Sequence, residues 1–393
     1  MFDKPFDKID KSDIESLIAN EVVESKQLDY KEKLPGDLRK EKQEFVEDVC
    51  SFGNASGGYI ILGLRDKRDG KGRKTGTPEY RGLEDVNIDQ EKLRLEHIIL
   101  NGVDPRIPGI RIKSIEGFNN GPIILIKIPQ SWSSPHLVKH NNRFYSRTSS
   151  GKYPLDVHEI RAAFAVSEAH PESIRRFRAD RLAKIVAGET PIELNEGAKM
   201  VLHIIPFGAF DTGSKCDLSL IASSDLPLIY SNGWTHRYNF DGLLTHDKLR
   251  DVPKAFEYVQ LFQNGVIEAL DTLIIQASDE RRMLSSGYEE ELVKALEAYL
   301  NVQGKLGVEA PFFVILSLLG VRGYGIGGVR SFYSRRGQDR IDRDTLVIPE
   351  VIIEEFECDI PEVMRPMFDS VWNAVGWPRS MNYDDNGKWI GCR

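Results

Sequence analysis

The stretch that most constrains the fold is one in which a helical pattern changes to a strand pattern across a pair of glycines. Arg39–Asn54 carries an apolar stripe that includes Phe45, which predicts an amphipathic helix. Gly57-Gly58 follows and predicts a tight turn, because glycine adopts positive φ without steric cost. Tyr59–Leu64 is then a continuous apolar run, typical of a buried strand. A helix that leads through a turn into a buried strand indicates a mixed α+β domain.

Similar patterns predict the rest of this first domain as a mixed sheet with helices. We expect further helices at Asp13–Val23, Gln90–Ile99 and Val157–Val166, and strands at Gln27–Leu34, Ile110–Ile115, Ile123–Ile128 and Arg143–Arg147.

A second α/β domain is expected beyond a basic helix, Pro171–Ala187, because 393 residues are enough for two domains. We predict a first domain over residues 1–168, a basic connecting helix and linker over 169–192, and a regulatory, recognition or assembly domain over 193–393. In the second domain we expect a helix at Tyr288–Asn301 and strands at Lys199–Ile205, Leu218–Ser223, Ala255–Gln263, Val266–Ile275 and Pro311–Leu319.

Cysteine usage and hydropathy exclude several classes of protein. The four cysteines lie too far apart for a CxxC motif, which excludes a zinc knuckle or a thioredoxin-like site: Cys50, Cys216, Cys358 and Cys392. Widely spaced cysteines in a long chain are typical of a reducing compartment. The first residues lack the apolar core of a signal peptide, and no apolar run approaches the ~18 residues of a membrane span. We therefore expect a cytoplasmic protein without a membrane partner.

The formal net charge of −8 argues, taken alone, against a nucleic-acid-binding protein. Residues 1–170, however, hold 27 basic and 27 acidic side chains, which leaves 25 of the 52 basic and 33 of the 60 acidic ones for the rest. Within the first part, Gly117–Leu155 contains no Asp or Glu, and Arg65–Lys74 has six basic residues in ten. Solvated loops and a nucleic-acid-binding surface both remain open for these two runs.

Three carboxylates and a lysine lie at or near two of the predicted strands. Asp29 and Lys31 share one face of the strand Gln27–Leu34, because side chains two residues apart point the same way. Glu24 lies just before that strand, and Asp66 follows a second, apolar strand. If these strands are neighbours, the carboxylates converge into a set of hard oxygen ligands that suits Mg²⁺ or Mn²⁺. From the pattern alone, solvated acidic residues at strand ends are the commoner explanation.

Several short motifs, taken together, resemble the Schlafen-type Alba-like domain (AlbA_2, formerly described as a divergent AAA-type ATP-binding domain). The resemblance covers roughly residues 15–165 and is of the prokaryotic type. It rests on Glu24 five residues before Asp29-Tyr30-Lys31, on Ser51–Gly58, on the strand Tyr59–Asp66 with its Gly63, on Arg81-Gly82-Leu83, and on Arg143–Arg147 followed by Ser149-Ser150.

The resemblance implies a metal-dependent endoribonuclease that cuts structured RNA such as tRNA, in a defence or stress response. The catalytic acids and metal ligands of the family fall on Glu24, Asp29 and Asp66, with Mg²⁺ or Mn²⁺ as cofactor, and Lys31 would position the scissile phosphate. Asp29 stands where family nucleases have Glu, which leaves the metal geometry open. Some members of the family are regulators, so a catalytically inactive DNA- or RNA-binding regulator is the alternative. Because the chain carries one copy of a domain that vertebrate Schlafens pair, a homodimer is expected.

Basic and aromatic residues near the candidate site are the predicted contacts to nucleic acid. On the strand Arg143–Arg147, alternation places three of them on one face. Exposed solubilising charges are the competing explanation for the set as a whole: Arg65, Lys67, Arg68, Lys139, Arg143, Tyr145 and Arg147.

A nucleotide-binding protein is the third hypothesis, because Gly323–Gly328 fits G-x-G-x-x-G after an apolar strand. The residues that follow do not form the apolar helix that a dinucleotide site requires, so a surface loop is expected. ATP is not expected either, because the chain has no GxxxxGK[ST]; the nearest fragment, Gly70–Thr75, has Arg73 where the glycine belongs.

Overall fold

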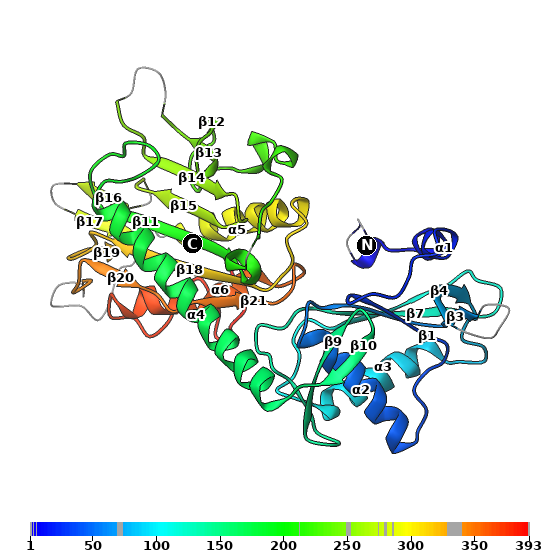
Figure 1. Cartoon of the computed structure of the whole chain (residues 1–393). Helices are drawn as coiled ribbons and strands as arrows, with labels where there is room; N and C mark the ends of the chain where they lie inside the picture. Colours follow the sequence, from blue (N-terminus) through cyan, green and yellow to red (C-terminus); the bar gives the residue numbers. More distant parts are fainter. Residues whose placement is uncertain are drawn as a thin grey trace. The chain divides into compact units, whose positions relative to one another are not determined.

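The computed structural model describes residues 2, 4, 6–68, 74–211, 213–248, 253–273, 275–278, 281–284, 287–327 and 340–391, and only the backbone of residues 68, 74, 76, 275–278 and 281–283. The chain divides into two compact units, Met1–Pro171 and Glu172–Arg393. Each unit combines helices with its own sheets, so the prediction of an α+β fold with a second sheet-containing part is confirmed (Figure 1).

The first unit begins with a 3₁₀ turn at Phe6–Lys8 and has its helices and strands in mixed order. They are α1 (Lys11–Ala19), β1 (Leu28–Lys31), α2 (Arg39–Gly53), β2 (Gly58–Leu62), β3 (Leu64–Arg68), β4 (Lys74–Tyr80), α3 (Ile88–Gly102), β5 (Val103–Asp104), β6 (Arg111–Ile115), β7 (Ile123–Ile128), β8 (Leu137–Val138), β9 (Arg143–Thr148), β10 (Gly151–Pro154) and the first part of α4 (Val157–Val186).

The main sheet of the first unit has the order β1-β2-β7-β6, with β1 parallel to β2 and the other pairs antiparallel. Strand alternation sends Ile60 and Ile126 into a core with α2 and α3. The intervening residues, such as Ile61 and Leu125, face a second core with α1. The sheet is therefore covered by α2 and α3 on one face and by α1 on the other (Figure 1).

Two smaller sheets complete this unit. One has the order β10-β9-β8-β5, and the other is the antiparallel pair β3-β4. β9 packs against α2, and Asn54 at the end of that helix fixes the contact. The Asn54 side-chain amide donates to the backbone oxygens of His136 and Tyr145, at 2.9 Å in both cases.

The second unit contains β11 (Lys199–Pro206), 3₁₀ turns at Phe207–Phe210, Leu218–Leu220 and Ser223–Asp225, β12 (Thr235–Tyr238), β13 (Gly242–His246), β14 (Glu257–Phe262), β15 (Ile267–Asp271), β16 (Ile275–Ser278), β17 (Arg281–Leu284), α5 (Tyr288–Lys305), β18 (Phe312–Leu319), β19 (Gly325–Ile326), β20 (Thr345–Val347), β21 (Val351–Ile353) and α6 (Ile360–Asn373). An eight-stranded sheet runs β12-β13-β14-β15-β11-β18-β20, with β21 also paired to β18. Leu182 and Ile185 of α4 pack on one face, and α5 and α6 pack on the other.

Three expectations about these elements differ from the structure. Val157–Val166 and Pro171–Ala187 are not two helices but parts of one helix, α4, which contains Pro171. Proline fixes φ near the helical value, so the helix continues through Pro171 with one backbone hydrogen bond fewer. The strand expected at Leu218–Ser223 is wrong, because Asp217 accepts a hydrogen bond from the Ser219 amide at 3.0 Å and starts a 3₁₀ turn.

The glycine-rich segment Gly323–Gly328 is described only in part. Gly325 and Ile326 form the short strand β19, which pairs in parallel with β17. Gly328, like Cys392 and most of the Gly70–Thr75 fragment, lies outside the described residues.

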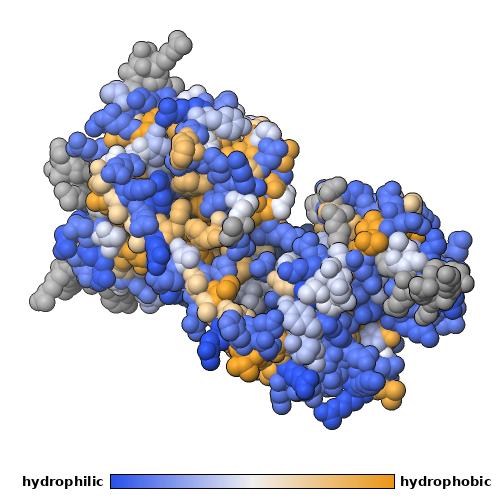
Figure 2. Space-filling model, viewed as in Figure 1, coloured by the Kyte–Doolittle hydropathy of each residue, from blue (hydrophilic) through white to orange (hydrophobic). Residues whose placement is uncertain are grey.

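Hydrophilic side chains dominate the surface in view, and hydrophobic ones form scattered patches on it (Figure 2). No helix in the described ranges combines the length and apolar character that crossing a membrane requires.

Candidate active site

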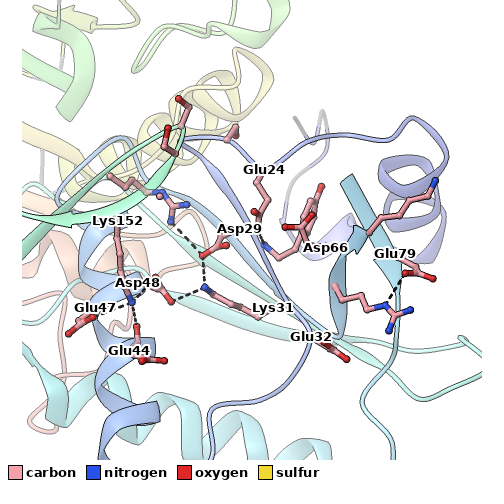
Figure 3. A pocket seen from close by; sticks show the side chains of 18 residues that line it. Glu24, Asp29, Lys31, Glu32, Glu44, Glu47, Asp48, Asp66, Glu79 and Lys152 are labelled. Carbon is pink, nitrogen blue, oxygen red and sulfur yellow. Dashed lines mark hydrogen bonds and ion pairs between the residues drawn. The ribbon is translucent and has the colours of Figure 1, made fainter. Parts of the chain in front are cut away.

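The candidate site lies at the edge of the first unit's main sheet. β1 is the edge strand, and its Leu28 and Tyr30 are buried on the α1 side. Asp29 and Lys31 therefore point to the opposite face, where α2 lies (Figure 3). The predicted shared face of Asp29 and Lys31 thus opens into a cavity.

A bend after β2 brings Asp66 to the same place. Gly63 has φ 97°, a conformation that a residue with a Cβ rarely adopts, and it directs β3 out of the main sheet to pair with β4. Asp66 on β3 and Glu24 before β1 both line this cavity. Figure 3 shows Glu24, Asp29 and Asp66 in one part of the cavity, although they come from separate segments.

The cavity has a volume of about 1010 Å³ and is lined mainly by charged residues. Its lining contains eight acidic and five basic side chains, among them all four residues predicted to be catalytic. The acidic ones are Glu24, Asp29, Glu32, Glu44, Glu47, Asp48, Asp66 and Glu79, and the basic ones are Lys31, Arg65, Lys67, Arg147 and Lys152.

Lys31 is held between two carboxylates at the floor of the cavity. Its Nζ lies 3.1 Å from Oδ2 of Asp29 and 3.0 Å from Oδ2 of Asp48 (Figure 3). Burial alone lowers the pKa of Lys31, but Asp48 and Asp29 outweigh it and raise that pKa above its ordinary value. Lys31 therefore carries a fixed positive charge.

Asp48, Glu47 and Lys152 belong to this site but were not predicted. Oδ1 of Asp48 lies 3.0 Å from Nζ of Lys152, and Oε2 of Glu47 lies 3.3 Å from the same nitrogen. The signal was present in the helix pattern, because Asp48 is three residues after Phe45 and so lies on the buried stripe of α2. A buried carboxylate on such a stripe requires a cationic partner.

Arg147 is the most buried of the predicted nucleic-acid contacts whose side chains are described. Its side chain is 4% exposed, its Nη1 lies 3.9 Å from Oδ2 of Asp29, and its guanidinium carbon lies 3.6 Å from the centre of the Phe52 ring. Nε and Nη1 of Arg147 make no hydrogen bond within the described part of the chain. Burial lowers the pKa of Arg147, which nevertheless stays far above neutrality as an arginine. The site thus contains a desolvated cation with unused N–H donors.

The carboxylates are close enough to perturb each other. Burial raises the pKa of Glu24, a hydrogen bond with Asp29 and the charge of Asp66 raise it further, and it reaches about 7. The hydrogen bond that Oε1 of Glu24 accepts from the Tyr30 amide, at 2.8 Å, opposes this rise without cancelling it. Such a shift is typical of functional sites.

The other predicted contacts lie in different environments. Arg65 and Lys67 line the cavity and pair with Glu79 at 2.8 Å and Glu21 at 3.0 Å. The side chain of Arg68 lies outside the described residues.

Strand β9 separates the remaining contacts. Lys139, just before it, and Arg143, at its start, are exposed and do not line the cavity. Tyr145 is buried against α2, and its hydroxyl donates to Oε1 of Glu47 at 3.0 Å. Alternation along β9 gave the correct common side, but that side packs on α2, so Tyr145 and Arg147 do not form an exposed surface with Arg143.

The predicted metal ligands fit a hard divalent cation in their chemistry. Carboxylate oxygens are the preferred ligands of Mg²⁺ and Mn²⁺, and the excess of acidic side chains in the cavity favours a cation. Within the described ranges, however, no three His, Cys, Asp or Glu side chains are arranged closely enough to hold a metal ion. Asp29 is instead engaged by Lys31 and Arg147.

The comparisons with known proteins agree with the predicted resemblance over the segment that builds this cavity. Residues 24–156, about a third of the chain, match the family model described as Schlafen, AlbA_2. The resemblance is thereby confirmed for this segment and supports a nucleic-acid-related function. No curated protein matches the chain.

Two solved structures are similar to a part of the chain. One is the DIP2311 protein from Corynebacterium diphtheriae, at 18% identity and a TM-score of 0.25, with 37% of this chain and 26% of that chain covered. The other is the N-terminal domain of a protein from Nitrosomonas europaea described as related to the ATP-dependent DNA helicase RecG, at 17% identity and a TM-score of 0.25, with 33% of this chain and 81% of that chain covered. The matched segment thus spans about a quarter of the Corynebacterium protein.

Proposed function

We propose that the first unit is a metal-dependent endoribonuclease of the Schlafen type that cuts structured, tRNA-like RNA. The observation that carries the proposal is the meeting of Glu24, Asp29 and Asp66 with Lys31 and Arg147 in one cavity. These residues come from four segments of the chain, so their meeting is a property of the fold and not of one motif.

Glu24, Asp29 and Asp66 would hold Mg²⁺ or Mn²⁺, and the bound ion would supply positive charge to the phosphodiester and acidify water. The chain's own residues contribute binding and orientation. Lys31 presents a fixed positive charge to a phosphate oxygen, and Arg147 offers its unused N–H donors to another. Because Arg147 stacks on Phe52, its guanidinium is oriented before substrate binds.

A regulator that binds DNA or RNA without cutting it is the second candidate. It is favoured by the ion pairs of Asp29 with Lys31 and Arg147, which occupy a carboxylate that a nuclease needs as a ligand. The two candidates share the same cavity and differ in whether metal-dependent cleavage occurs.

Cleavage of end-labelled tRNA in the presence of Mn²⁺ distinguishes these candidates. We expect the wild-type chain to cut the RNA with Mn²⁺ and not with EDTA, and Asp66→Ala to lose at least about 100-fold in rate, the scale of removing a group that stabilises developing charge. Glu79→Gln is the matched control, because Glu79 lines the same cavity but pairs with Arg65 and is 44% exposed.

Equal rates for wild type and Asp66→Ala would show that Asp66 takes no part in any cleavage and would remove the proposed nuclease site. Binding of RNA or DNA by the wild-type chain without metal-dependent cleavage would establish the regulator. The homodimer, the defence or stress role and the regulatory second domain remain proposals, of which light scattering tests the first directly.

A further inference from the structure

A second, smaller cavity in the first unit carries only basic and neutral side chains. It has a volume of about 460 Å³ and lies where α2, α3 and the turn after β8 meet. Lys42 comes from α2, Arg94 and His97 from α3, and His140 from the turn. None of the described residues that line this cavity is Asp or Glu, in contrast to the mainly acidic candidate active site.

Two nitrogens in this cavity have hydrogen-bonding capacity that is not used. Arg94 donates to the carboxylate of Glu91 and, through Nη2, to the Pro35 oxygen at 2.6 Å, which fixes the direction of its guanidinium. Its Nη1 and the Nδ1 of His140 are buried and make no hydrogen bond to the part of the chain that is described. Buried polar atoms are usually satisfied, so a ligand or ordered water is expected to complete this pair.

The exposed carboxylate of Asp37 lies beside two cations of this cavity and shows where they attract an anionic oxygen. Oδ1 of Asp37 lies 3.1 Å from Nζ of Lys42 and 3.9 Å from Nη1 of Arg94. The Asp37 side chain is 90% exposed, whereas those of Lys42 and Arg94 are 32% and 27% exposed. Exposed ion pairs of this kind are weak and exchange readily with other anions.

We infer that the Lys42–Arg94–His140 cavity binds a backbone phosphate of the nucleic acid, away from the candidate active site. This inference rests on the proposed function in one respect, namely that nucleic acid is the partner. The donors suit a phosphate group, because the remaining Nη1 of Arg94, the ammonium of Lys42 and an imidazole nitrogen of His140 belong to residues that line one cavity. Phosphate contacts of this type position a substrate without reading its sequence.

The positions of Lys42 and Asp48 on α2 constrain the nucleic acid that can reach both cavities. Lys42 precedes Asp48 of the candidate active site by six residues, which is about 9 Å along the helix and about 120° around its axis. The two cavities therefore open on different sides of α2. A nucleic acid that reaches both must extend over several nucleotides and bend around the helix, and a very short single strand cannot satisfy both.

Binding of fluorescently labelled tRNA by the full chain, measured by anisotropy in EDTA, tests the inference without cleavage. Lys42→Gln should weaken binding about tenfold at low salt and reduce the slope of log K against log salt by about 0.7–0.9, as for the loss of one phosphate contact. Asp37→Asn should tighten binding, because it removes the competing carboxylate. Lys40→Gln, an exposed lysine of α2 outside the cavity, is the control and should change binding less than Lys42→Gln.

The outcomes separate this inference from the proposed function. Binding that depends on Lys42 in a chain that does not cleave RNA would support the phosphate site and overturn the nuclease. Cleavage by the wild type, together with equal RNA affinity for Lys42→Gln and Lys40→Gln, would support the nuclease and overturn the phosphate site. Absence of any tRNA binding would overturn the phosphate site. Asp37 is exposed, so Asp37→Asn should fold and can test the site even if Lys42→Gln fails to fold. If Asp37→Asn binds tRNA with the same affinity as the wild type, this result counts against the phosphate site.

Discussion

Replacing Glu24 by glutamine should stabilise the first unit at alkaline pH when no divalent cation is present. The folded chain raises the pKa of Glu24 from 4.5 to about 7, because burial and the nearby Asp29 and Asp66 disfavour its charge. A carboxyl with a raised pKa contributes stability that is complete below pH 4.5 and is lost as the pH rises through 7. At pH 8 the folded wild type therefore carries the full cost of an ionised Glu24, and glutamine removes that cost.

The magnitude follows from the size of the shift and from the exposure of the side chain. A rise in pKa from 4.5 to about 7 corresponds to roughly 3 kcal/mol for a group shielded from water. Glu24 is partly exposed, so solvent screening reduces the expected gain to about 1 kcal/mol in the free energy of unfolding. Glutamine keeps the oxygen that accepts the Tyr30 amide, so little is lost in exchange.

Differential scanning calorimetry of the full chain in EDTA measures this gain. For a unit of this size, 1 kcal/mol corresponds to about 2–4 °C in Tm, and hydrogen exchange assigns the transition to the first unit. The gain at pH 8 should shrink toward zero by pH 4.5. Glu32→Gln is the control, because Glu32 lines the same cavity but lies 3.8 Å from Arg81 and is 42% exposed. If Glu24→Gln gives no larger gain at pH 8 than at pH 4.5, the carboxylates do not repel each other as described.

Two further predictions concern buried charges in the two units. Asp48→Asn should lower the free energy of unfolding of the first unit by about 2 kcal/mol, because it removes a buried carboxylate that pairs with both Lys31 and Lys152; urea unfolding checks this, and a change below about 0.5 kcal/mol would count against the ion-pair network. In the second unit, burial would raise the pKa of Glu268, but its two hydrogen bonds from Arg181, at 2.8 and 2.7 Å, and its bond with His203 hold that pKa near 2. The lowered pKa stabilises the fold above pH 4.5 and the effect fades as the pH falls toward 2, so Glu268→Gln should cost about 3 kcal/mol at pH 7 and much less at pH 3. A cost that is independent of pH, measured by denaturant titration, would contradict this assignment.

The features that local pattern could predict are those that depend on neighbours in sequence. The period of two along β1 placed Asp29 and Lys31 on one face, and the glycine pair at the start of β2 makes the expected sharp change of direction, with φ 64° at Gly57. The helical stripe of α2 also appeared in the sequence. Each of these follows from the geometry of a single strand, turn or helix.

The features that could not be predicted depend on which elements meet. Alternation along β9 places Arg147 and Tyr145 on one side but does not say that α2 covers that side. The sequence predicted one continuous strand that ends near Asp66. In the structure the positive φ of Gly63 divides it into β2 and β3, and the chain leaves the main sheet at Gly63. Asp48 carried a visible signal, a carboxylate on an apolar stripe, but its partners Lys31 and Lys152 come from β1 and β10.

Helix α2 is the element that relates the two cavities of the first unit. Asp48 faces the candidate active site, Lys42 faces the smaller cavity, and a rigid helix fixes their separation. Asn54 joins the end of this helix to the backbone beside β9 through three hydrogen bonds, the shortest of which is the 2.6 Å bond from the His136 amide to its Oδ1. Arg147 on β9 is therefore held in register with Asp48, and a nucleic acid bound at Lys42 as proposed would be presented to a site whose cations are already oriented. An RNA that engaged only one cavity would gain none of this orientation, which is the physical reason to expect selectivity for RNA that spans both cavities over very short single strands.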